Sequence, residues 1–348
     1  MSGGVDSSVA AALLVKAGYK VTGVFIKVWQ PDFSDCNWKK NRLDAMRVCA
    51  LLNIPLITLG LEKIYKKFVI RYMLDEYDRG LTPNPDVMCN KQIKFGAFYD
   101  WAKSKGADCI ATGHYAQTVR HLHKNKLNYL LTVSSDKNKD QTYFLWTLKK
   151  DRLPFILFPV GKYKKHMVRD IARNLKLPNA NKKDSQGLCF IGNIDIKKYI
   201  STRVKVSGGS VLNLKGDIIG SHDGAQLYTI GERHGFRIFD NIGRVKPLYV
   251  ISKDIKSNTI TVSGRSLTEN AISDVLINRV NWINGVPPSP KKTYRCRYRY
   301  RNILQKCRIS QDKNSYRVHF NKPQWFIPSG QSLVIYDGII CFGGGIIV

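Results

Sequence analysis

Apolar and polar positions in the first half of the chain alternate between helical and strand patterns. Residues 9–16 form an apolar, alanine-rich stretch that predicts a helix ending at Gly18, and residues 19–29 form a β-branched and aromatic run typical of a buried parallel strand. The same patterns predict a helix over 40–52, a strand over 54–59, a helix over 61–80 and a strand over 107–113. Strands that alternate with helices predict an α/β fold with a doubly wound parallel sheet, whose ligands bind beyond the carboxyl ends of the strands.

The pattern changes near Ser201 to short β-rich runs separated by glycines, which predict a small β-rich central domain. Residues 294–301 then alternate Tyr or Cys with Arg, a period of two that predicts a strand with its arginines on one face. Such a face suits RNA phosphates and stacked bases, although an ordinary exposed barrel strand has the same pattern. With three further predicted strands, this region indicates a C-terminal β-barrel. The predicted domains are 1–200, 201–265 and 266–348.

The first eight residues carry the sharpest chemical pattern in the chain. Gly3 and Gly4 precede Asp6, Ser7 and Ser8 and lead directly into the first predicted helix. Paired glycines turn backbone N–H groups toward an anion, and a helix N-terminus adds partial positive charge. This predicts a phosphate-binding loop without the Lys-Ser/Thr of a Walker loop, with Asp6 placed to hold magnesium. The alternative is an ordinary glycine turn with a serine cap.

The composition adds a large positive charge to this picture. Lys and Arg number 56 against 26 Asp and Glu, a formal net charge of +30. A polyanionic partner explains such an excess, because a cationic surface releases the counterions of a nucleic acid; a solvated lysine-rich surface is the alternative. The chain has no run of eighteen apolar residues and no signal peptide, which predicts a cytoplasmic protein without a membrane partner. Its eight cysteines form no C-x-x-C pair, which argues against a zinc knuckle and a disulfide scaffold.

Two cysteines lie in polar loops that favour reactivity. The segment after Cys89 has the features of a helix start, and a thiol there beside Lys91 should have a lowered pKa. Asp86, three residues earlier, is close enough to act as a general acid or base. Cys189 lies in a glycine-bearing loop with basic neighbours that would stabilise a thiolate or persulfide. Taken alone, Cys89 also fits a turn cysteine beside a capping aspartate; the two cysteines together indicate sulfur chemistry.

Several motifs, in order along nearly the whole chain, resemble the bacterial tRNA-specific 2-thiouridylases of the PP-loop ATP pyrophosphatase superfamily. They are SGGVDSS (2–8), TPNPDVMCNKQIKFG (82–96), ATGHYA (111–116), KDQTYFL (139–145), FPVGKYKK (158–165), KKDSQGLCFIG (182–192), YTIGERHG (228–235) and GGGII (343–347). The resemblance implies an enzyme that uses ATP to adenylate the 2-carbonyl oxygen of the wobble uridine and then transfers sulfur to it. It implies ATP, magnesium and tRNA as ligands, and as partners a cysteine desulfurase or relay protein and a reductant.

The resemblance also assigns roles to individual residues. Cys89 would be the nucleophile, Cys189 the persulfide carrier and Asp86 the proton carrier, with a Cys89–Cys189 disulfide reopened by the reductant. Asp6 would hold magnesium. The residues expected around ATP are Met1, Ser2, Gly3, Gly4, Val5, Asp6, Ser7, Ser8, Ile26 and Gly113. The residues expected to contact tRNA are Asn84, Pro85 and Asp86 at the target base and Lys139, Asp140, Gln141, Arg299 and Tyr300 elsewhere.

Other interpretations remain open at this point. A PP-loop ligase or amidating enzyme would need no cysteine pair, and a non-catalytic RNA-binding protein would need no phosphate loop. Cys89, Cys189 and Asp86 are also a conceivable ligand set for an iron–sulfur cluster, which is not the favoured route. His114 fits a structural histidine as well as a substrate contact. In the family a strand normally precedes the loop, so the start at Met1 indicates a mis-set start or a lost strand. Ile26 and Glu232 stand where the family usually has methionine and glutamine.

Overall fold

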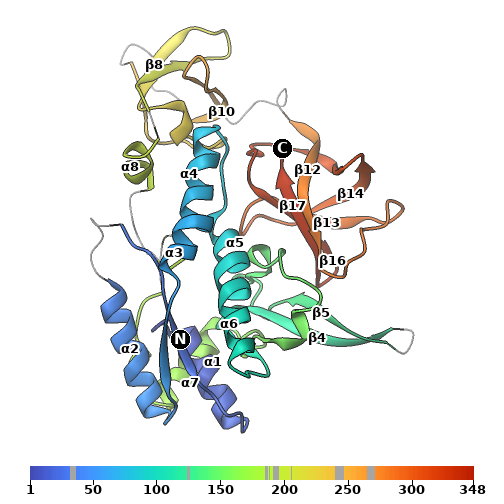
Figure 1. Ribbon diagram of the computed structural model, residues 1–348. Helices are drawn as coiled ribbons and strands as arrows, with labels where there is room; N and C mark the ends of the chain where they lie inside the picture. Colours follow the sequence, from blue (N-terminus) through green and yellow to red (C-terminus); the bar gives the residue numbers. More distant parts are fainter. Residues whose placement is uncertain are drawn as a thin grey trace.

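The computed structural model of the chain describes residues 1–31, 37–123, 126–184, 187, 189–190, 196–204, 206–239, 247–264 and 271–348. These residues form an α/β part coloured blue to green in Figure 1, a β-rich part coloured yellow, and a β-barrel coloured orange to red. No helix within these ranges has both the length and the apolar character that crossing a membrane requires.

The α/β part is built from helices that alternate with short parallel strands. Its strands pair in parallel as β1 (Gly23–Lys27) with β2 (Leu56–Gly60) and β3 (Ile110–Ala111) with β6 (Ile156–Leu157). Its helices are α1 (Val5–Lys16), α2 (Asn37–Leu51), α3 (Glu62–Tyr65), the π-helix η1 (Lys66–Ile70), α4 (Arg71–Asp78), α5 (Pro85–Cys89), the π-helix η2 (Asn90–Ala97), α6 (Phe98–Ser104), the 3₁₀ helices η3 (Thr142–Phe144) and η4 (Leu153–Phe155), α7 (Lys165–Asn174) and α8 (Ile196–Ser201). The predicted parallel α/β class is confirmed, and the predicted helix over 61–80 is observed as α3, η1 and α4 in succession.

The central part is one five-stranded sheet that packs against α4. Its strands occur in the order β10-β11-β7-β8-β9 across the sheet. They are β7 (Gly209–Leu212), β8 (Ile218–His222), β9 (Phe236–Ile238), β10 (Leu248–Asp254) and β11 (Thr259–Gly264), with the 3₁₀ helix η5 (Ala225–Leu227) between β8 and β9. Leu74 and Tyr77 of α4 pack onto its buried apolar residues, so this helix joins the α/β part to the sheet.

The last part is a closed antiparallel barrel, as the alternating sequence predicts. Its strands are β12 (Ile272–Trp282), β13 (Tyr294–Arg297), β14 (Gln305–Asp312), β15 (Ser315–Gln324), β16 (Ser332–Asp337) and β17 (Ile340–Ile347). Closure follows because β12 pairs with both β15 and β17. A hairpin of the α/β part, β4 (Ala116–His123) and β5 (Lys126–Val133), joins the barrel through the pairing of Thr132 with Ile340.

One hydrophobic core is shared between the α/β part and the barrel. Side chains of α5, η2 and the segment around η3 pack with strands β16 and β17, and Trp146 donates from Nε1 to Ser332 Oγ at 3.0 Å. The buried members on the two sides include Val87, Phe95, Tyr143, Trp146, Val334, Tyr336 and Cys341. Since apolar burial is the main driving force of packing, this core fixes the barrel beside the helix that carries Cys89.

Candidate active site

The first turn of α1 has the conformation of an anion-binding loop. Gly4 is its N-cap in an extended conformation, and Gly3 has a φ of 74°, which glycine adopts without steric cost. The hydroxyls of Ser7 and Ser8 donate to the Gly4 carbonyl at 3.0 Å, whereas the N–H groups of Ser2 and Gly4 donate to the hydroxyls of Ser7 and Ser2 at 3.2 and 3.3 Å. The glycine conformation and the helix N-terminus favour an anion at this loop, and phosphate binding there stays a prediction.

Gly113 supports this loop by its lack of a side chain. A Cβ at this position would lie 2.7 Å from the carbonyl carbon of Asp6 and the backbone nitrogen of Ser7. Tyr115, two residues later, donates from its hydroxyl to Asp6 Oδ1 at 2.9 Å. The turn after β3 thus lies directly against the loop, and binding of ATP at Gly113 stays a prediction.

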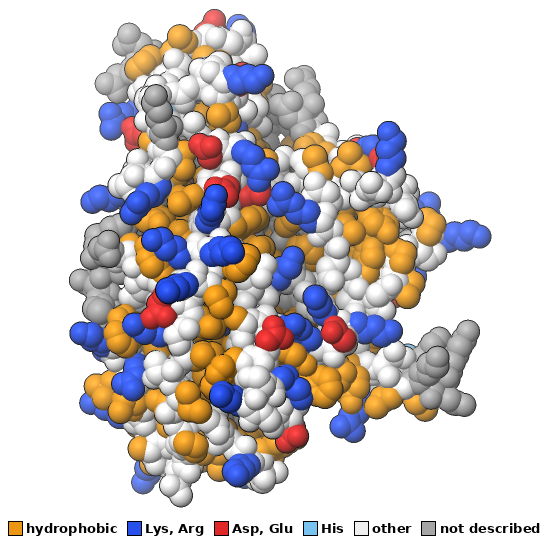
Figure 2. Space-filling model, in the orientation of Figure 1, with side chains coloured by type: hydrophobic (Ala, Val, Ile, Leu, Met, Phe, Trp, Pro, Cys, Tyr) orange, Lys and Arg blue, Asp and Glu red, His pale blue; other side chains and the backbone are white. Residues whose placement is uncertain are grey.

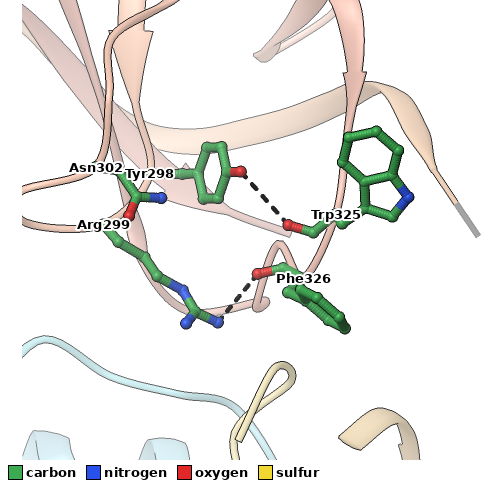
Figure 3. A pocket seen from close by; sticks show the side chains of 5 residues that line it. All are labelled: Tyr298, Arg299, Asn302, Trp325 and Phe326. Carbon is green, nitrogen blue, oxygen red and sulfur yellow. Dashed lines mark hydrogen bonds between the residues drawn. The ribbon is translucent and has the colours of Figure 1, made fainter. Parts of the chain in front are cut away.

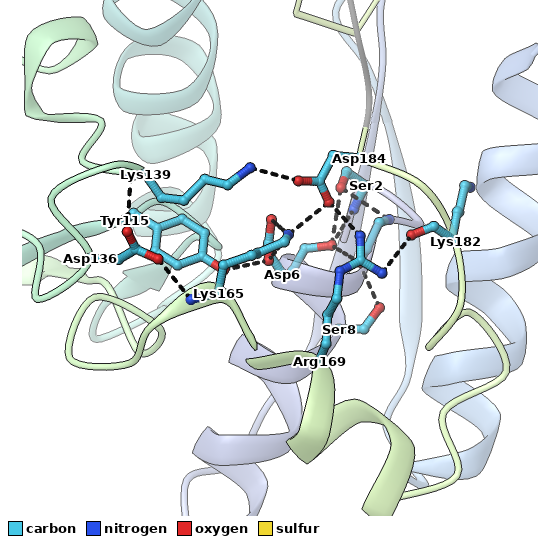
Figure 4. A network of polar contacts seen from close by, with 12 residues as sticks. Ser2, Asp6, Ser8, Tyr115, Asp136, Lys139, Lys165, Arg169, Lys182 and Asp184 are labelled. Atoms are coloured by element: carbon cyan, nitrogen blue, oxygen red, sulfur yellow. Dashed lines mark hydrogen bonds and ion pairs between the residues drawn. The ribbon is translucent and has the colours of Figure 1, made fainter. Parts of the chain in front are cut away.

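A network of cations and carboxylates surrounds Asp6 (Figure 4). Lys165 Nζ lies 2.7 and 2.9 Å from the two carboxylate oxygens of Asp6 and 2.8 Å from Asp184 Oδ1. Asp184 also pairs with Lys139 at 2.9 Å and Arg169 at 2.8 Å. Burial opposes the charged form of Asp184, but the bonds from Lys165 and Lys139 outweigh it and hold its pKa well below the usual range.

Two further residues fix the loop from its other side. Asn179 Nδ2 donates to the Gly3 carbonyl at 3.0 Å and to Ser8 Oγ at 2.9 Å. Lys182 Nζ donates to the same carbonyl at 3.1 Å and pairs with Asp44 at 2.6 Å. The residues present suit a nucleoside triphosphate, because basic side chains lie around the helix N-terminus of the loop, and carboxylates, Asp6 among them, are available for a cation. Ile26, expected near adenine, is a buried residue of β1 in the apolar cluster that includes Cys89.

The helix that carries Cys89 begins before the cysteine, contrary to prediction. Asn84 is the N-cap of α5, its side chain accepts from the Val87 N–H at 3.2 Å, and Pro85 occupies the first turn. Cys89 is the last residue of α5 and continues directly into η2, so its thiol lies inside a continuous helical segment. It is fully buried, and the helix-start argument for a reactive Cys89 is therefore wrong.

Cys189 comes to Cys89 from a distant loop. Its backbone N–H donates to Asp86 Oδ1 at 2.9 Å, and its carbonyl accepts from the Tyr65 hydroxyl at 3.0 Å. Cys89 and Cys189 pack in one apolar cluster, their thiols are close enough to shift each other's pKa, and both cysteines are free. The structure thus brings together the three residues predicted to be catalytic.

The pKa values of the two thiols are shifted in opposite directions. Burial, followed by the hydrogen bond that the Cys89 thiol donates, raises the pKa of Cys89 well above its ordinary value. The same hydrogen bond, accepted by Cys189, lowers the pKa of Cys189 to about 7 against the cost of burial, with further help from Lys94. The predicted lowered pKa of Cys89 is wrong because burial dominates, and the cation near the thiols is Lys94 rather than the exposed Lys91.

Asp86 is suited to hold a proton. Burial raises its pKa, although the bond from the Cys189 N–H and the charge of Lys94 oppose the rise. Among the described residues, no group of three or more His, Cys, Asp and Glu side chains could hold a metal ion. The described geometry therefore gives no support to an iron–sulfur cluster on Cys89, Cys189 and Asp86.

His114 is buried beside Lys94, close to the cysteine pair. Its Nε2 is 3.3 Å from Lys94 Nζ and its Nδ1 is 2.7 Å from Thr112 Oγ1. Burial, together with the charge of Lys94, lowers the pKa of His114 well below its ordinary value, so the ring is neutral at physiological pH. In the described chain His114 thus has internal partners on both nitrogens.

The stretch expected to contact tRNA, residues 139–141, is bound within the chain. Asp140 is 2% exposed and accepts from Thr142 Oγ1 at 2.8 Å and from the Ser134 N–H at 3.2 Å. Gln141 Oε1 accepts from the Tyr115 N–H at 2.9 Å. These contacts support the turn beside the phosphate loop, and a direct contact of Asp140 or Gln141 with tRNA stays a prediction.

The arginine-rich segment is a strand only in its first half. β13 ends at Arg297, so the predicted strand over 294–301 is wrong beyond that residue. The Arg297 guanidinium is buried over the Tyr336 ring and lies 3.8 Å from Asp140. Arg299 lies beyond the strand and donates to the carbonyls of Ile230 and Phe326, which ties the central sheet to the barrel. Tyr300 packs on Phe144 with ring centroids 4.6 Å apart.

Two surface pockets adjoin this segment. One, of about 440 Å³, is lined by Tyr298, Arg299, Asn302, Trp325 and Phe326, and Figure 3 shows Arg299 directed toward the backbone of Phe326 and the Tyr298 hydroxyl toward that of Trp325. The other, of about 570 Å³, is strongly basic and lies where the 137–139 turn meets the barrel. Its cationic lining residues are Lys137, Lys139, Arg295, Arg297 and Arg301. Lys and Arg are also spread over the face seen in Figure 2, with few acidic side chains among them.

Several residues of the site carry no assignment from the sequence. Lys165 and Asp184 fall within motifs already noted, but nothing in their spacing shows that they would meet across the phosphate loop. Lys94 lies five residues after Cys89, and Tyr65 lies in an amphipathic helical stretch, so both read as ordinary helix residues. Only their tertiary contacts identify them.

Comparison with known proteins gives consistent matches over the whole chain. Family profiles match in order: tRNA methyl transferase HUP domain over 1–193, tRNA methyl transferase PRC-barrel domain over 197–264 and aminomethyltransferase beta-barrel domain over 273–347. A protein of Nitrosomonas europaea named tRNA-specific 2-thiouridylase MnmA is 42% identical over 353 residues, which cover 100% of this chain and 96% of the relative. A protein of the same name from Listeria monocytogenes serotype 4a is 43% identical over 352 residues, covering 100% and 93%.

Proposed function

The chain belongs to the tRNA-specific 2-thiouridylase family, and we propose that it replaces the 2-oxygen of the wobble uridine of tRNA with sulfur, using ATP. The observation that carries this proposal is the contact between the thiols of Cys89 and Cys189 beside Asp86. A ligase that adenylates a carboxylate has no use for that pair, and an RNA-binding protein has no use for the phosphate loop. We assign catalysis to residues 1–200, with 201–265 as a central domain and 266–348 as a tRNA-binding domain.

The first step we propose is activation of the uracil carbonyl. The oxygen at position 2 is a poor leaving group, so its attack on the α-phosphorus of ATP, with release of pyrophosphate, converts it to an adenylate. The loop over Met1–Ser8 and Gly113 would hold the phosphates, with Ile26 near adenine. Lys165 is already 2.7 Å from Asp6, and Asp6 would hold magnesium, which stabilises phosphate charge.

The second step is sulfur transfer from a Cys189 persulfide. The terminal sulfur forms a bond to carbon 2 and AMP leaves with the former carbonyl oxygen. Cys89 attacks the inner sulfur of Cys189, so the persulfide S–S bond breaks and a Cys89–Cys189 disulfide forms. A thiol reductant then returns both residues to thiols. In an alternative order of steps, Cys89 first attacks the inner sulfur of Cys189 and releases hydrosulfide from the persulfide. The hydrosulfide then attacks carbon 2, and the products are the same.

Substrate access follows from the position of the thiols. Cys89 is buried, so the uridine must leave the anticodon stack to reach it. Asn84, Pro85 and Asp86 would meet the base, and Asp86 would carry the proton, since burial raises the pKa of its carboxyl group. The basic pocket with Lys139 and the pocket with Arg299, beside Tyr300, would accept the tRNA backbone and bases.

Sulfur delivery requires a cysteine desulfurase or relay protein, and we place the reaction in the cytoplasm.

Nucleoside mass spectrometry tests the proposal. Unmodified tRNA is incubated with the protein, ATP, magnesium, a cysteine desulfurase and cysteine, and digested to nucleosides. We expect 2-thiouridine from the wild type and none from Cys189→Ala, with Cys109→Ala as a matched cysteine control outside the pair. Absence of 2-thiouridine from folded protein that binds tRNA and ATP would contradict the proposal.

A further inference from the structure

We propose that Lys94 is a positioning residue that holds Cys189 as the anionic member of the cysteine pair. The inference deepens the proposed function, because it says how one thiol of two is selected to carry sulfur. It rests on the contacts that Lys94 makes with Cys189, Phe190 and His114, and on the helical geometry that brings it there.

The π-helix η2 accounts for the position of Lys94. Lys94 is five residues after Cys89, and a π-helix bonds residue i to residue i+5, so position 94 lies one turn beyond the cysteine. In an α-helix Gln92 and Ile93 would occupy that place. Gly96 accommodates the wider turn, since a Cβ there would lie 2.7 Å from the Lys91 carbonyl oxygen.

His114 orients the ammonium group. An ammonium has only donors, so Lys94 donates to His114 Nε2 at 3.3 Å, and the neutral ring carries its proton on Nδ1 toward Thr112 Oγ1. The positive charge of Lys94 also acts on both sulfurs, and more strongly on Cys189 than on Cys89. Burial by itself would lower the pKa of Lys94, but the nearby Cys189 and Cys89 outweigh burial and raise it, so the ammonium stays charged.

Phe190 couples the same ammonium to the Cys189 loop. Lys94 Nζ lies 5.3 Å from the centroid of the Phe190 ring, within cation–π range. Phe190 has a φ of 68°, a left-handed conformation that is unfavourable for a non-glycine residue. Its packing against the buried cluster around Cys89 and its contact with Lys94 hold that conformation. Lys94 therefore binds the residue that follows Cys189 in the loop, which places its charge near the Cys189 sulfur.

Among the charged groups of the described residues near the two sulfurs, Lys94 is the one that favours a thiolate. The groups that face the two sulfurs are Asp86, Lys94 and Tyr65, and Asp86 opposes a thiolate. The charge of Lys94 favours a thiolate on either cysteine, but burial outweighs it at Cys89 and does not at Cys189. Cys189 is thus the favoured thiolate, and Cys89 remains a thiol that donates to it. The same ammonium would pair with a persulfide anion on Cys189.

Alkylation of Cys189 by iodoacetamide as a function of pH tests this role without tRNA or ATP. Full-length wild type, Lys94→Met, Lys94→Gln and Lys94→Arg are compared by mass spectrometry of the peptide that contains Cys189. Lys91→Met is the matched control, because it removes a charge from the same helix at an exposed position. Because a cation within hydrogen-bonding distance shifts a pKa by about 1–3 units, we expect both neutral variants to raise the alkylation midpoint by about one unit or more.

At pH 7 this shift slows alkylation about fivefold or more, while Lys94→Arg and Lys91→Met stay near wild type. An unchanged midpoint in folded Lys94→Gln or Lys94→Met would overturn the proposal, and Lys94→Gln keeps a donor of similar length if methionine prevents folding. Single-turnover thiolation gives a second readout. We expect the acid limb of its pH profile to move upward in Lys94→Gln with the KM for ATP unchanged, whereas an equal loss at every pH would indicate a structural role only. Failure of thiolation in the wild type would overturn the proposed function and leave the alkylation result standing.

Discussion

The carboxylate of Asp86 accepts a hydrogen bond at 2.9 Å from the backbone N–H of Cys189, a residue 103 positions away. This one contact joins the helix of the first cysteine to the loop of the second. It also places the negative charge of Asp86 beside the Cys189 sulfur, where it raises the pKa of that thiol. Asp86 therefore has two separable effects, one on the position of the loop and one on the charge of the pair.

Replacement of Asp86 by Asn separates these effects. The amide oxygen still accepts from the Cys189 N–H, but the charge that disfavours a thiolate is lost, so the midpoint of Cys189 alkylation should move to lower pH. Thiolation should fall by about 10²-fold or more, because the amide cannot transfer a proton. Single-turnover assays and alkylation measure the two effects. Asp75→Asn, on the exposed face of α4, is the control; unchanged thiolation in Asp86→Asn would exclude Asp86 as the proton carrier.

Gly113→Ala tests the turn against the phosphate loop. The added Cβ would lie 2.7 Å from backbone atoms of Asp6 and Ser7, which cannot move without deforming the loop. We expect ATP affinity to fall by at least about tenfold, roughly the loss of one hydrogen bond to a charged group. Isothermal calorimetry measures the affinity. Gly264→Ala, where a Cβ meets nothing within 4 Å, should bind ATP normally, and equal affinity in the two variants would argue against this role of Gly113.

Much of the fold follows from local sequence patterns. Alternating apolar residues in 316–320 predict a barrel strand because a strand with one buried face has a period of two, and the continuous apolar run over 333–336 predicts a strand buried on both faces; β15 and β16 include these residues. The phosphate loop is recognisable because Gly3 and Gly4 precede a helix that lacks any other reason for paired glycines. In both cases the determining interactions lie within a few residues of each other.

The chemistry of the cysteine pair depends on contacts that local patterns do not carry. Asn84 caps α5 and moves the helix start ahead of Cys89, so burial rather than a helix terminus sets the acidity of that thiol. The periodicity of an α-helix gives no sign of η2, and therefore none of the approach of Lys94. Arg299 is a residue type that often contacts RNA, yet its observed hydrogen bonds join two domains.

Asp184 should contribute stability that depends on pH. Its pKa is lowered in the folded chain, so its ion pairs stabilise the protein above the unfolded value of about 3.9 and lose their effect as the pH falls below it. Asp184→Asn should lower the Tm at pH 7, and the difference from wild type should shrink as the pH falls from about 5 to below 3. Scanning calorimetry checks this. Asp170→Asn, which removes an exposed i,i+3 pair, should leave the Tm unchanged, and a constant difference for Asp184→Asn would show that its ion pairs are not responsible.

The net charge of +30 predicts a steep dependence of tRNA affinity on salt. If about six phosphates are neutralised, the affinity should fall by about three orders of magnitude between 50 and 200 mM salt, because each contact releases condensed counterions. The basic pocket identifies one such contact: Arg295→Gln should reduce the slope of log affinity against log salt by about one. Lys292→Gln serves as control, because Lys292 lies outside the pocket and is paired with Asp337 at 2.6 Å. A flat salt response, or equal slopes in wild type and Arg295→Gln, would remove the pocket from the tRNA-binding surface, and filter binding over this salt range decides between these outcomes.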